Sequence, residues 1–217
     1  MVFTIPREEV LEQLLLQLKS HFLLLYEEEK VIEARFEYAL AACEENFLNS
    51  DNKYYLTEVG GVKCCRFNPY HSVQYMTFLY YLSHDIYNNA NVGQLCDKMY
   101  YLNKILHSVD LFYAIELPAH FGAEHPLGAV MGRAKYSNGL FFYQGCTVGG
   151  TRDKHGNLYY PVIEENVRMY ANSSILGRCH IGRNAQIGAG ALVKNQDVPA
   201  NSVVFGQSPN LIIKERK

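Results

Sequence analysis

The stretch "SSILGRCHIGRNAQIGAGALV", residues 173–193, decides the fold, because an aliphatic side chain recurs in it at every sixth position. The same register runs backward along the chain, and its members are Ile163, Met169, Ile175, Ile181, Ile187 and Val193. A small or slender residue fills the fifth place of each hexad: Val167, Ser173, Cys179, Ala185 and Ala191. Helices repeat every 3.6 residues and strands every two, so neither alone produces a period of six. The pattern predicts a parallel β-helix with three hexads per turn, aliphatic residues inside and small residues near the corners.

The chain divides into two halves with different patterns. Up to about residue 110, apolar residues recur at three- and four-residue spacing, which predicts helices, one of them aromatic-rich over 70–87. Glycines become frequent from about residue 119, and four of them are expected to ease the corners: Gly177, Gly182, Gly188 and Gly190. We therefore predict an α+β chain with a helical domain over 1–112 and a β-helix over 113–217. A loop over 151–161 breaks the six-residue register and is expected to protrude.

Composition and charge narrow the classes of partner. The 217 residues are 48% hydrophobic and carry a formal net charge of −2, so no nucleic-acid partner held by bulk charge is expected. The apolar stretch 14–26 is too short and too interrupted by polar residues to span a bilayer, so no stable membrane insertion is expected. The N-terminus lacks the apolar run of a secretory signal, and the six cysteines show no CxxC spacing. A cytoplasmic protein with reduced thiols is predicted.

Four motifs in residues 110–217 resemble those of the hexapeptide-repeat acyltransferases, and within them those of the serine acetyltransferases. The motifs are "GAEHPLGAVMGRA" (122–134), "GCTVGGT" (145–151), "ILGRCHIGRNAQIGAGALV" (175–193) and "DVPANSVVFGQSP" (197–209). The helical half matches that group more loosely. The resemblance implies a left-handed β-helix, acetyl transfer from acetyl-CoA as co-substrate without a metal, and a homotrimer with its sites between neighbouring coils. Whether two trimers pair through the helical half stays open.

The resemblance also implies which residues react with the acceptor. His125 would be the general base that takes the proton from an acceptor hydroxyl, and an imidazole suits this role because its ordinary pKa lies near neutral. Glu124 stands where the family usually has Asp. Since adjacent residues of a strand face opposite ways, we expect Glu124 to contact the acceptor rather than to orient the imidazole.

The same resemblance places the CoA arm. Its expected contacts are Gly150, Thr151, Ala171 and Ala189. The alanines suit this role because a wall of small residues lets the pantetheine chain lie close to the coil backbone. Lys214, in the basic tail with Arg216 and Lys217, would reach the CoA phosphates; a solvated tail is the alternative.

One departure from the family concerns the acceptor. Serine acetyltransferases carry Arg-His-Pro after the Gly-Gly-Thr loop, whereas this chain has Tyr159, Tyr160 and Pro161. Tyrosines offer ring faces and neutral hydroxyls, so we expect a sugar or polysaccharide hydroxyl as acceptor, with serine as the alternative. Arg152 in the protruding loop would touch an acidic group of the substrate, unless the loop is simply solvated.

Two other classes of function use the same kind of coil. A zinc carbonic anhydrase would need three convergent histidines; His120 and His125 have a suitable spacing, and His155 or His180 would have to be the third. A trimeric scaffold without catalysis is the other alternative. The acid–His pair ahead of the Gly-Gly-Thr loop favours the acetyltransferase over both.

Overall fold

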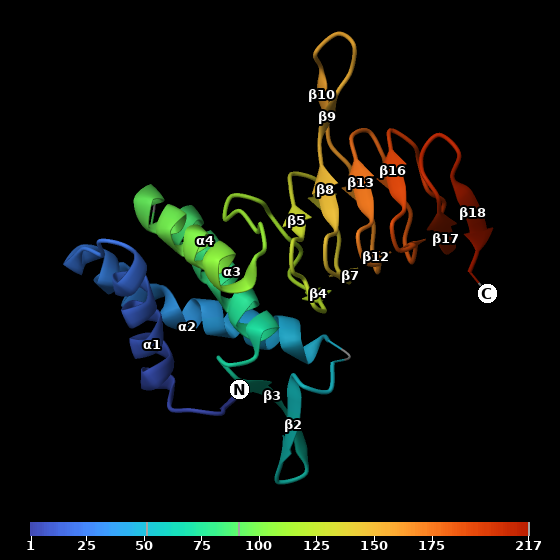
Figure 1. Cartoon of the computed structure of the whole chain (residues 1–217). Coiled ribbons are helices and arrows are strands. Elements are labelled where there is room, and N and C mark those ends of the chain that lie inside the picture. The colour runs from blue at the N-terminus through green and yellow to red at the C-terminus, as the bar shows by residue number, and fades with distance from the viewer. Residues whose placement is uncertain (51, 91, 217) are drawn as a thin grey trace. The chain divides into compact units, whose positions relative to one another are not determined.

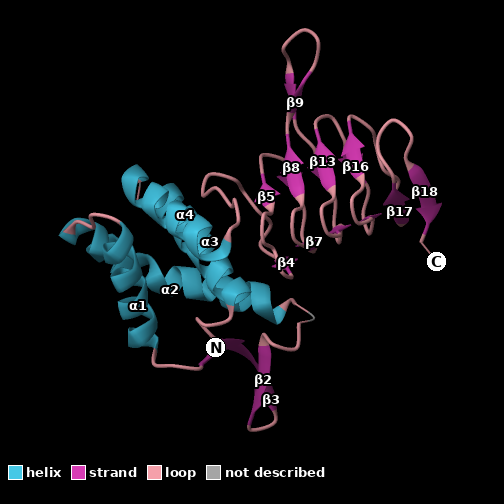
Figure 2. Cartoon of the chain, in the orientation of Figure 1, coloured by secondary structure: helices cyan, strands magenta, loops and turns pink. Residues whose placement is uncertain are grey.

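The computed structural model describes residues 1–50, 52–90 and 92–216 (Figures 1 and 2). The chain forms two compact units, Met1–His107 and Ser108–Lys217. Residues 108–112 go with the second unit, since Asp110 forms a parallel bridge with Val130 and its N–H donates to the carbonyl of Ala129.

In its described residues, 1–50, 52–90 and 92–107, the first unit holds four helices and a small sheet. The helices are α1 (Arg7–His21), α2 (Tyr26–Leu48), α3 (Ser72–Asn89) and α4 (Gly93–His107), and the strands are β1 (Val2–Phe3), β2 (Leu56–Val59) and β3 (Val62–Phe67). In α1, Glu8 and Glu9 lie in the first turn and Lys19 in the last, which is the charge order that the helix dipole favours. Most aromatic residues of the stretch 70–87 are buried, among them Tyr75, Phe78 and Tyr80, whereas Tyr70 and Tyr87 are exposed. Strands β2 and β3 form an antiparallel hairpin.

The second unit is the expected left-handed parallel β-helix, built from three sheets. Its parallel strands are β4 (Phe121–Ala123), β5 (Val130–Met131), β6 (Lys135–Tyr136), β7 (Leu140–Phe142), β8 (Thr147–Gly149), β11 (Val162–Ile163), β12 (Arg168–Met169), β13 (Ser174–Leu176), β14 (His180–Ile181), β15 (Gln186–Ile187), β16 (Leu192–Lys194) and β17 (Ser202–Phe205). β18 (Ile212–Glu215) closes the last sheet antiparallel to β17. The first coil is β4, β5 and β6, the second β7, β8 and β11, the third β12, β13 and β14, and the fourth begins with β15 and β16.

The interior follows the six-residue period. Every aliphatic member of the register from Ile163 to Val193 is fully buried, and the small residues of the fifth places, from Val167 to Ala191, are buried with them. The parallel pairs stack these positions directly, for example Met169 on Ile187. This arrangement confirms the predicted interior.

Each coil turns at three corners, which we name by the sheet they follow. Corner A follows the six-stranded sheet, corner B the four-stranded sheet of β5, β8, β13 and β16, and corner C the three-stranded sheet of β6, β11 and β14. Gly177 and Gly190 have positive φ at these turns as expected, whereas Gly182 and Gly188 do not. Gly182 is needed for space instead, because an added Cβ would run into the backbone of Ala200.

Asparagines share the left-handed positions with glycine, which the sequence analysis did not foresee. At corner C, Asn166, Asn184 and Asn201 have φ of 58°, 60° and 54°. Their side chains form a ladder: Asn166 Nδ2 donates to Asn184 Oδ1 at 3.2 Å, and Asn184 Nδ2 donates to Asn201 Oδ1 at 2.8 Å. Asparagine tolerates this conformation better than other residues with a Cβ, and the ladder satisfies its amides.

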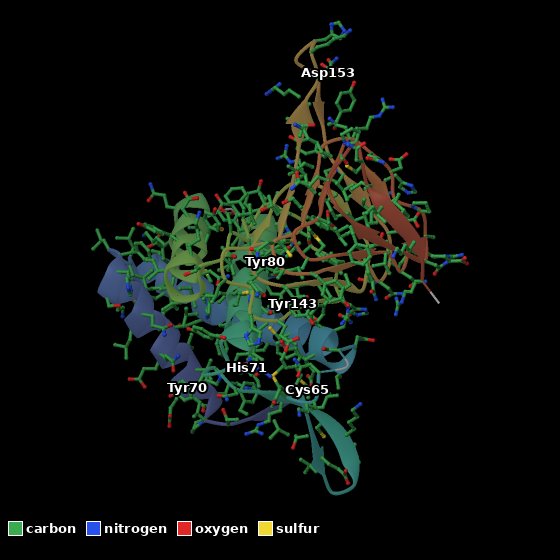
Figure 3. All side chains as sticks on the ribbon, turned by 45° about the vertical axis from the view of Figure 1, so that its right-hand side comes forward. Cys65, Tyr70, His71, Tyr80, Tyr143 and Asp153 are labelled. Carbon is green, nitrogen blue, oxygen red and sulfur yellow. The ribbon has the colours of Figure 1, made fainter. Side chains whose placement is uncertain are left out.

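A hairpin leaves the second coil at corner B (Figures 1 and 3). It consists of β9 (Thr151–Arg152) and the antiparallel β10 (Leu158–Tyr159). Asp153, labelled in Figure 3, holds the turn, since its carboxylate accepts hydrogen bonds from the N–H groups of His155 and Asn157 at 2.8 and 2.9 Å. The pKa of Asp153 is lowered mainly by the side-chain amide of Asn157, which donates to Asp153 Oδ2 at 3.0 Å, and the two backbone hydrogen bonds add to this.

Candidate active site

Corner A aligns the expected base with the expected wall of alanines. The register pairs Ala123 with Phe142, Phe142 with Met169, and Met169 with Ile187. Two residues beyond these strand positions lie His125, Gln144, Ala171 and Ala189, one on each successive coil. His125, Ala171 and Ala189 therefore lie along one edge of the β-helix.

Glu124 and His125 lie just beyond the end of β4, where the chain turns. His125 has a φ of 50°, and Glu124 Oε1 lies 3.9 Å from His125 Nε2. Both side chains are exposed, at 78% for His125 and 53% for Glu124. The expectation that the two face opposite ways is wrong, because alternation holds within a strand and the left-handed turn at His125 brings the two groups together.

Tyr143 is a neighbour of this pair that the sequence analysis missed (labelled in Figure 3). Its ring stacks on that of Tyr170, with centroids 5.5 Å apart and planes 12° apart. Burial raises the pKa of its phenol, and a hydrogen bond with the Glu124 carboxylate adds to this. Counting from the paired strands would have placed Tyr143 next to Glu124, since each comes one residue after a paired position.

Corner B carries the second group of expected residues. An added Cβ on Gly150 would lie 2.8 Å from Cδ1 of Tyr160, so the ring packs against this glycine. Thr151 Oγ1 donates to Asn195 Oδ1 at 3.0 Å. Arg152 Nη1 donates to the carbonyl of Gly156 at 2.8 Å, so this guanidinium is engaged within the hairpin.

Each of the two tyrosines carries an arginine that the sequence analysis did not single out. The guanidinium of Arg133 lies over the ring of Tyr160, 5.6 Å from its centroid, and that of Arg178 lies 5.9 Å from the centroid of Tyr159. Each arginine directly follows a glycine, in "MGRA" and "LGRC", although the strand register places Arg133 one hexad position earlier than Arg178. The ring faces that were expected to stack on a sugar are therefore partly occupied.

A pocket of about 260 Å³ lies at the base of the hairpin. It is lined by Thr151, Asp153, Tyr159, Arg178 and Asn195. All of these residues belong to corner B or its hairpin, so the pocket is separate from the edge that holds His125.

One chain therefore does not bring all the expected site residues together. Glu124, His125, Ala171 and Ala189 lie at corner A, whereas Gly150, Thr151, Arg152, Tyr159 and Tyr160 lie at corner B. Lys214 is in β18, paired with Val203 of β17, and is exposed. Lys217 lies outside the described residues.

The zinc hypothesis finds no support in the described part of the chain, where no group of three or more His, Cys, Asp or Glu side chains could hold a metal ion. His180, one of the histidines considered for that role, pairs with Glu164 at 3.0 Å instead. Across residues 1–50, 52–90 and 92–216, every helix is too short or too polar to cross a membrane.

Residues 160–195 match the model of the family described as "Bacterial transferase hexapeptide (six repeats)". The chain is 34% identical to a serine acetyltransferase of Synechococcus elongatus over 107 residues, which cover 49% of this chain and 43% of that one. It is 32% identical to a serine acetyltransferase of Staphylococcus xylosus over 144 residues, which cover 62% of this chain and 61% of that one. The chain spans only about half the length of several curated relatives that it matches, since the matched regions cover between 43% and 58% of three serine acetyltransferases.

Solved structures share the fold. A serine acetyltransferase of Neisseria gonorrhoeae superposes with a TM-score of 0.64 at 24% identity, covering 88% of this chain and 71% of that one. A serine acetyltransferase in complex with CoA superposes with a TM-score of 0.64 at 20% identity, covering 86% of this chain and 75% of that one. The resemblance to hexapeptide-repeat acyltransferases of the serine acetyltransferase-like group is thus confirmed, together with helices followed by a left-handed β-helix.

Proposed function

We propose that this chain is an acetyl-CoA-dependent O-acetyltransferase whose acceptor is the hydroxyl of L-serine. The observation that carries the proposal is the alignment of His125 with Ala171 and Ala189 along one edge, because it sets a base beside a wall of small residues. The similarity to serine acetyltransferases supports serine over the sugar acceptor that the sequence analysis preferred. A cytoplasmic location remains a prediction.

The proposed reaction is direct transfer. The neutral imidazole of His125 accepts the proton of the acceptor hydroxyl while that oxygen attacks the thioester carbonyl. The tetrahedral intermediate collapses with cleavage of the C–S bond, and the imidazolium returns the proton to the leaving CoA sulfur. Glu124, 3.9 Å from the imidazole, is close enough to stabilise the positive charge that His125 carries in between.

The donor site follows from the small residues. Ala171 and Ala189 leave the coil backbone accessible, so the amides of the pantetheine chain can hydrogen bond to it. The resemblance also assigns Gly150 and Thr151 to binding of the pantetheine chain. The amide N–H groups near Gly150 would stabilise the oxyanion. Lys214 is assigned to the CoA phosphates on its charge and exposure.

A homotrimer completes the site. Since corners A and B are separated within one chain, residues from both can meet only if corner A of one copy faces corner B of the next. Such an arrangement repeats around a threefold axis and yields three equal sites. Pairing of two trimers through the helical unit remains a prediction.

The cation–ring contacts support a charged acceptor. Arg133 lies over Tyr160, whose ring also packs against Gly150, so a pyranose ring would have to displace the arginine to stack there. Positive charge is therefore present at the loop, although the loop tripeptide itself has none.

The test is release of free CoA from acetyl-CoA with L-serine in one reaction and a panel of sugars, nucleotide sugars and short oligosaccharides in others. We expect turnover with serine alone. Turnover with a saccharide alone would overturn the serine assignment, and absence of turnover with every acceptor would favour the trimeric scaffold.

A further inference from the structure

Two of the three arginines at corner B, Arg133 and Arg178, have no acidic partner among the described residues, and the third, Arg152, donates to the carbonyl of Gly156. Across the described ranges 1–50, 52–90 and 92–216, neither Arg133 nor Arg178 forms a salt bridge, and each is exposed. Each guanidinium instead lies over a tyrosine ring. A guanidinium on a ring keeps N–H donors at its edge, and these match the two oxygens of a carboxylate or phosphate. Corner B therefore presents two anion-binding groups.

Arg133 and Arg178 belong to different coils of the β-helix. His125 and Arg133 both belong to the first coil, whereas Ala171 and Arg178 both belong to the third. Neighbouring parallel strands lie about 4.8 Å apart, so the two arginines are separated by roughly 10 Å along the coil axis. Arg133 is thus at the level of the base, and Arg178 is at the level of the donor wall.

We propose that Arg133 is the specificity-determining residue for the acceptor: its guanidinium, held by Tyr160, binds the carboxylate of an α-amino acid beside His125 of the neighbouring copy. The inference rests on the proposed function and on its trimer. The acceptor's negative charge would thus be recognised by a residue of the coil, Arg133, and not by a residue of the loop motif. Tyr160 is the positioning residue, and Gly150 gives its ring room.

The carboxylate is a better ligand for this place than a neutral group. An unpaired guanidinium gains a charge-assisted, two-oxygen contact from a carboxylate, whereas a sugar hydroxyl or an amide offers only single neutral acceptors. The β-hydroxyl of serine is two bonds from the carbon that carries the carboxyl group, so one small molecule can reach both groups. The wild-type enzyme should therefore discriminate against acceptors that keep this hydroxyl and lack the charge.

The experiment compares L-serine with L-serinamide, which has the same hydroxyl and amine but no carboxylate. For Arg133→Met we expect KM for serine to rise roughly 10- to 100-fold, as for the loss of a hydrogen-bonded ion pair, with kcat changed far less. KM for acetyl-CoA and turnover of serinamide should be unchanged. Arg178→Met is the matched control, because it removes the same group from the other tyrosine and should leave the serine-to-serinamide preference intact.

The outcomes distinguish failure of the Arg133 assignment from failure of the proposed function. If Arg133→Met keeps the wild-type preference for serine, the assignment of Arg133 is overturned while the proposed function stands. If the wild-type enzyme does not acetylate serine at all, the proposed function fails first. Should Arg133→Met not fold, Arg133→Lys keeps a charge without the planar fork, and its KM for serine should still rise severalfold; an unchanged KM would again overturn the assignment.

Discussion

The carboxylate of Glu124 lies 3.9 Å from the imidazole of His125, although the two residues are adjacent in the sequence. The left-handed turn at His125 makes this approach geometrically available, because the residues lie beyond the last paired position of β4. Besides burial, the same carboxylate helps to raise the pKa of the Tyr143 phenol, so these two groups are neighbours. The base is therefore the end of a row of polar groups formed by His125, Glu124 and Tyr143.

Replacement of His125 by alanine should abolish transfer. Removal of a general base lowers the rate by about 10²- to 10⁴-fold, and no second imidazole lies on the same corner to replace it. The variant should keep its oligomeric mass and its affinity for CoA, since its side chain is 78% exposed and supports no core contact. Activity is measured by CoA release, and mass and affinity by light scattering and calorimetry. Normal transfer by this variant would refute the proposed mechanism.

Tyr143→Phe should weaken catalysis without loosening the fold. The change removes the phenol from Glu124 and leaves the ring stack on Tyr170 intact. A lost hydrogen bond to a charged group predicts a decrease in kcat/KM for the acceptor of about tenfold. KM for acetyl-CoA and the melting temperature should not change. Tyr170→Phe, which keeps the same stack and the Tyr143 phenol, is the control and should remain fully active.

Ala189→Leu should block the donor wall. The added side chain would occupy the edge along which the pantetheine chain is proposed to lie, so KM for acetyl-CoA should rise about tenfold or more, in line with typical costs of overpacking. Ala200→Leu is the matched control, because Ala200 is also exposed but lies at corner C. If both variants keep the wild-type KM, the alanines do not line the donor site.

The period of six predicts the fold because it specifies, residue by residue, which side chains point into the coil. It does not specify which residues of successive coils become neighbours at a corner, since that depends on strand pairing and on turns that lie outside the hexads. This is why the row of Tyr143 and Glu124, and the contacts of Arg133 and Arg178, escaped the sequence analysis. The sugar hypothesis counted charges only within the loop tripeptide, whereas the guanidinium over Tyr160 comes from the preceding coil.

The stability of the helical unit should fall at mildly acidic pH because of His107. Its imidazole is 8% exposed and Nδ1 lies 2.7 Å from Asn103 Oδ1; burial lowers its pKa from 6.5 to about 4. Between these values the unfolded chain binds the proton and the folded chain does not. The associated stability is therefore complete above about pH 6.5 and is lost as the pH falls toward 4, a change on the order of 3 kcal/mol.

The check is urea unfolding of the wild-type protein and of His107→Gln at a series of pH values. Glutamine keeps a donor for Asn103 but does not titrate. The variant's unfolding free energy should depend less on pH between 4 and 6.5 than that of the wild type. Identical pH profiles for the two proteins would show that His107 is not the titrating group.

The asparagine ladder of corner C should stabilise the coil by its backbone conformation as well as by its hydrogen bonds. Asn184 has a φ of 60° and links Asn166 to Asn201 through its side chain. Asn184→Ala replaces a residue that tolerates the left-handed region by one that tolerates it less well, and it removes both links, so we expect a loss of about 2 to 3 kcal/mol in unfolding free energy. Asn184→Gly removes the same links but relieves the conformation, so it should lose less than the alanine variant. Thermal and denaturant unfolding measure both; a glycine variant as unstable as the alanine variant would mean that the hydrogen bonds, rather than the turn geometry, hold the corner.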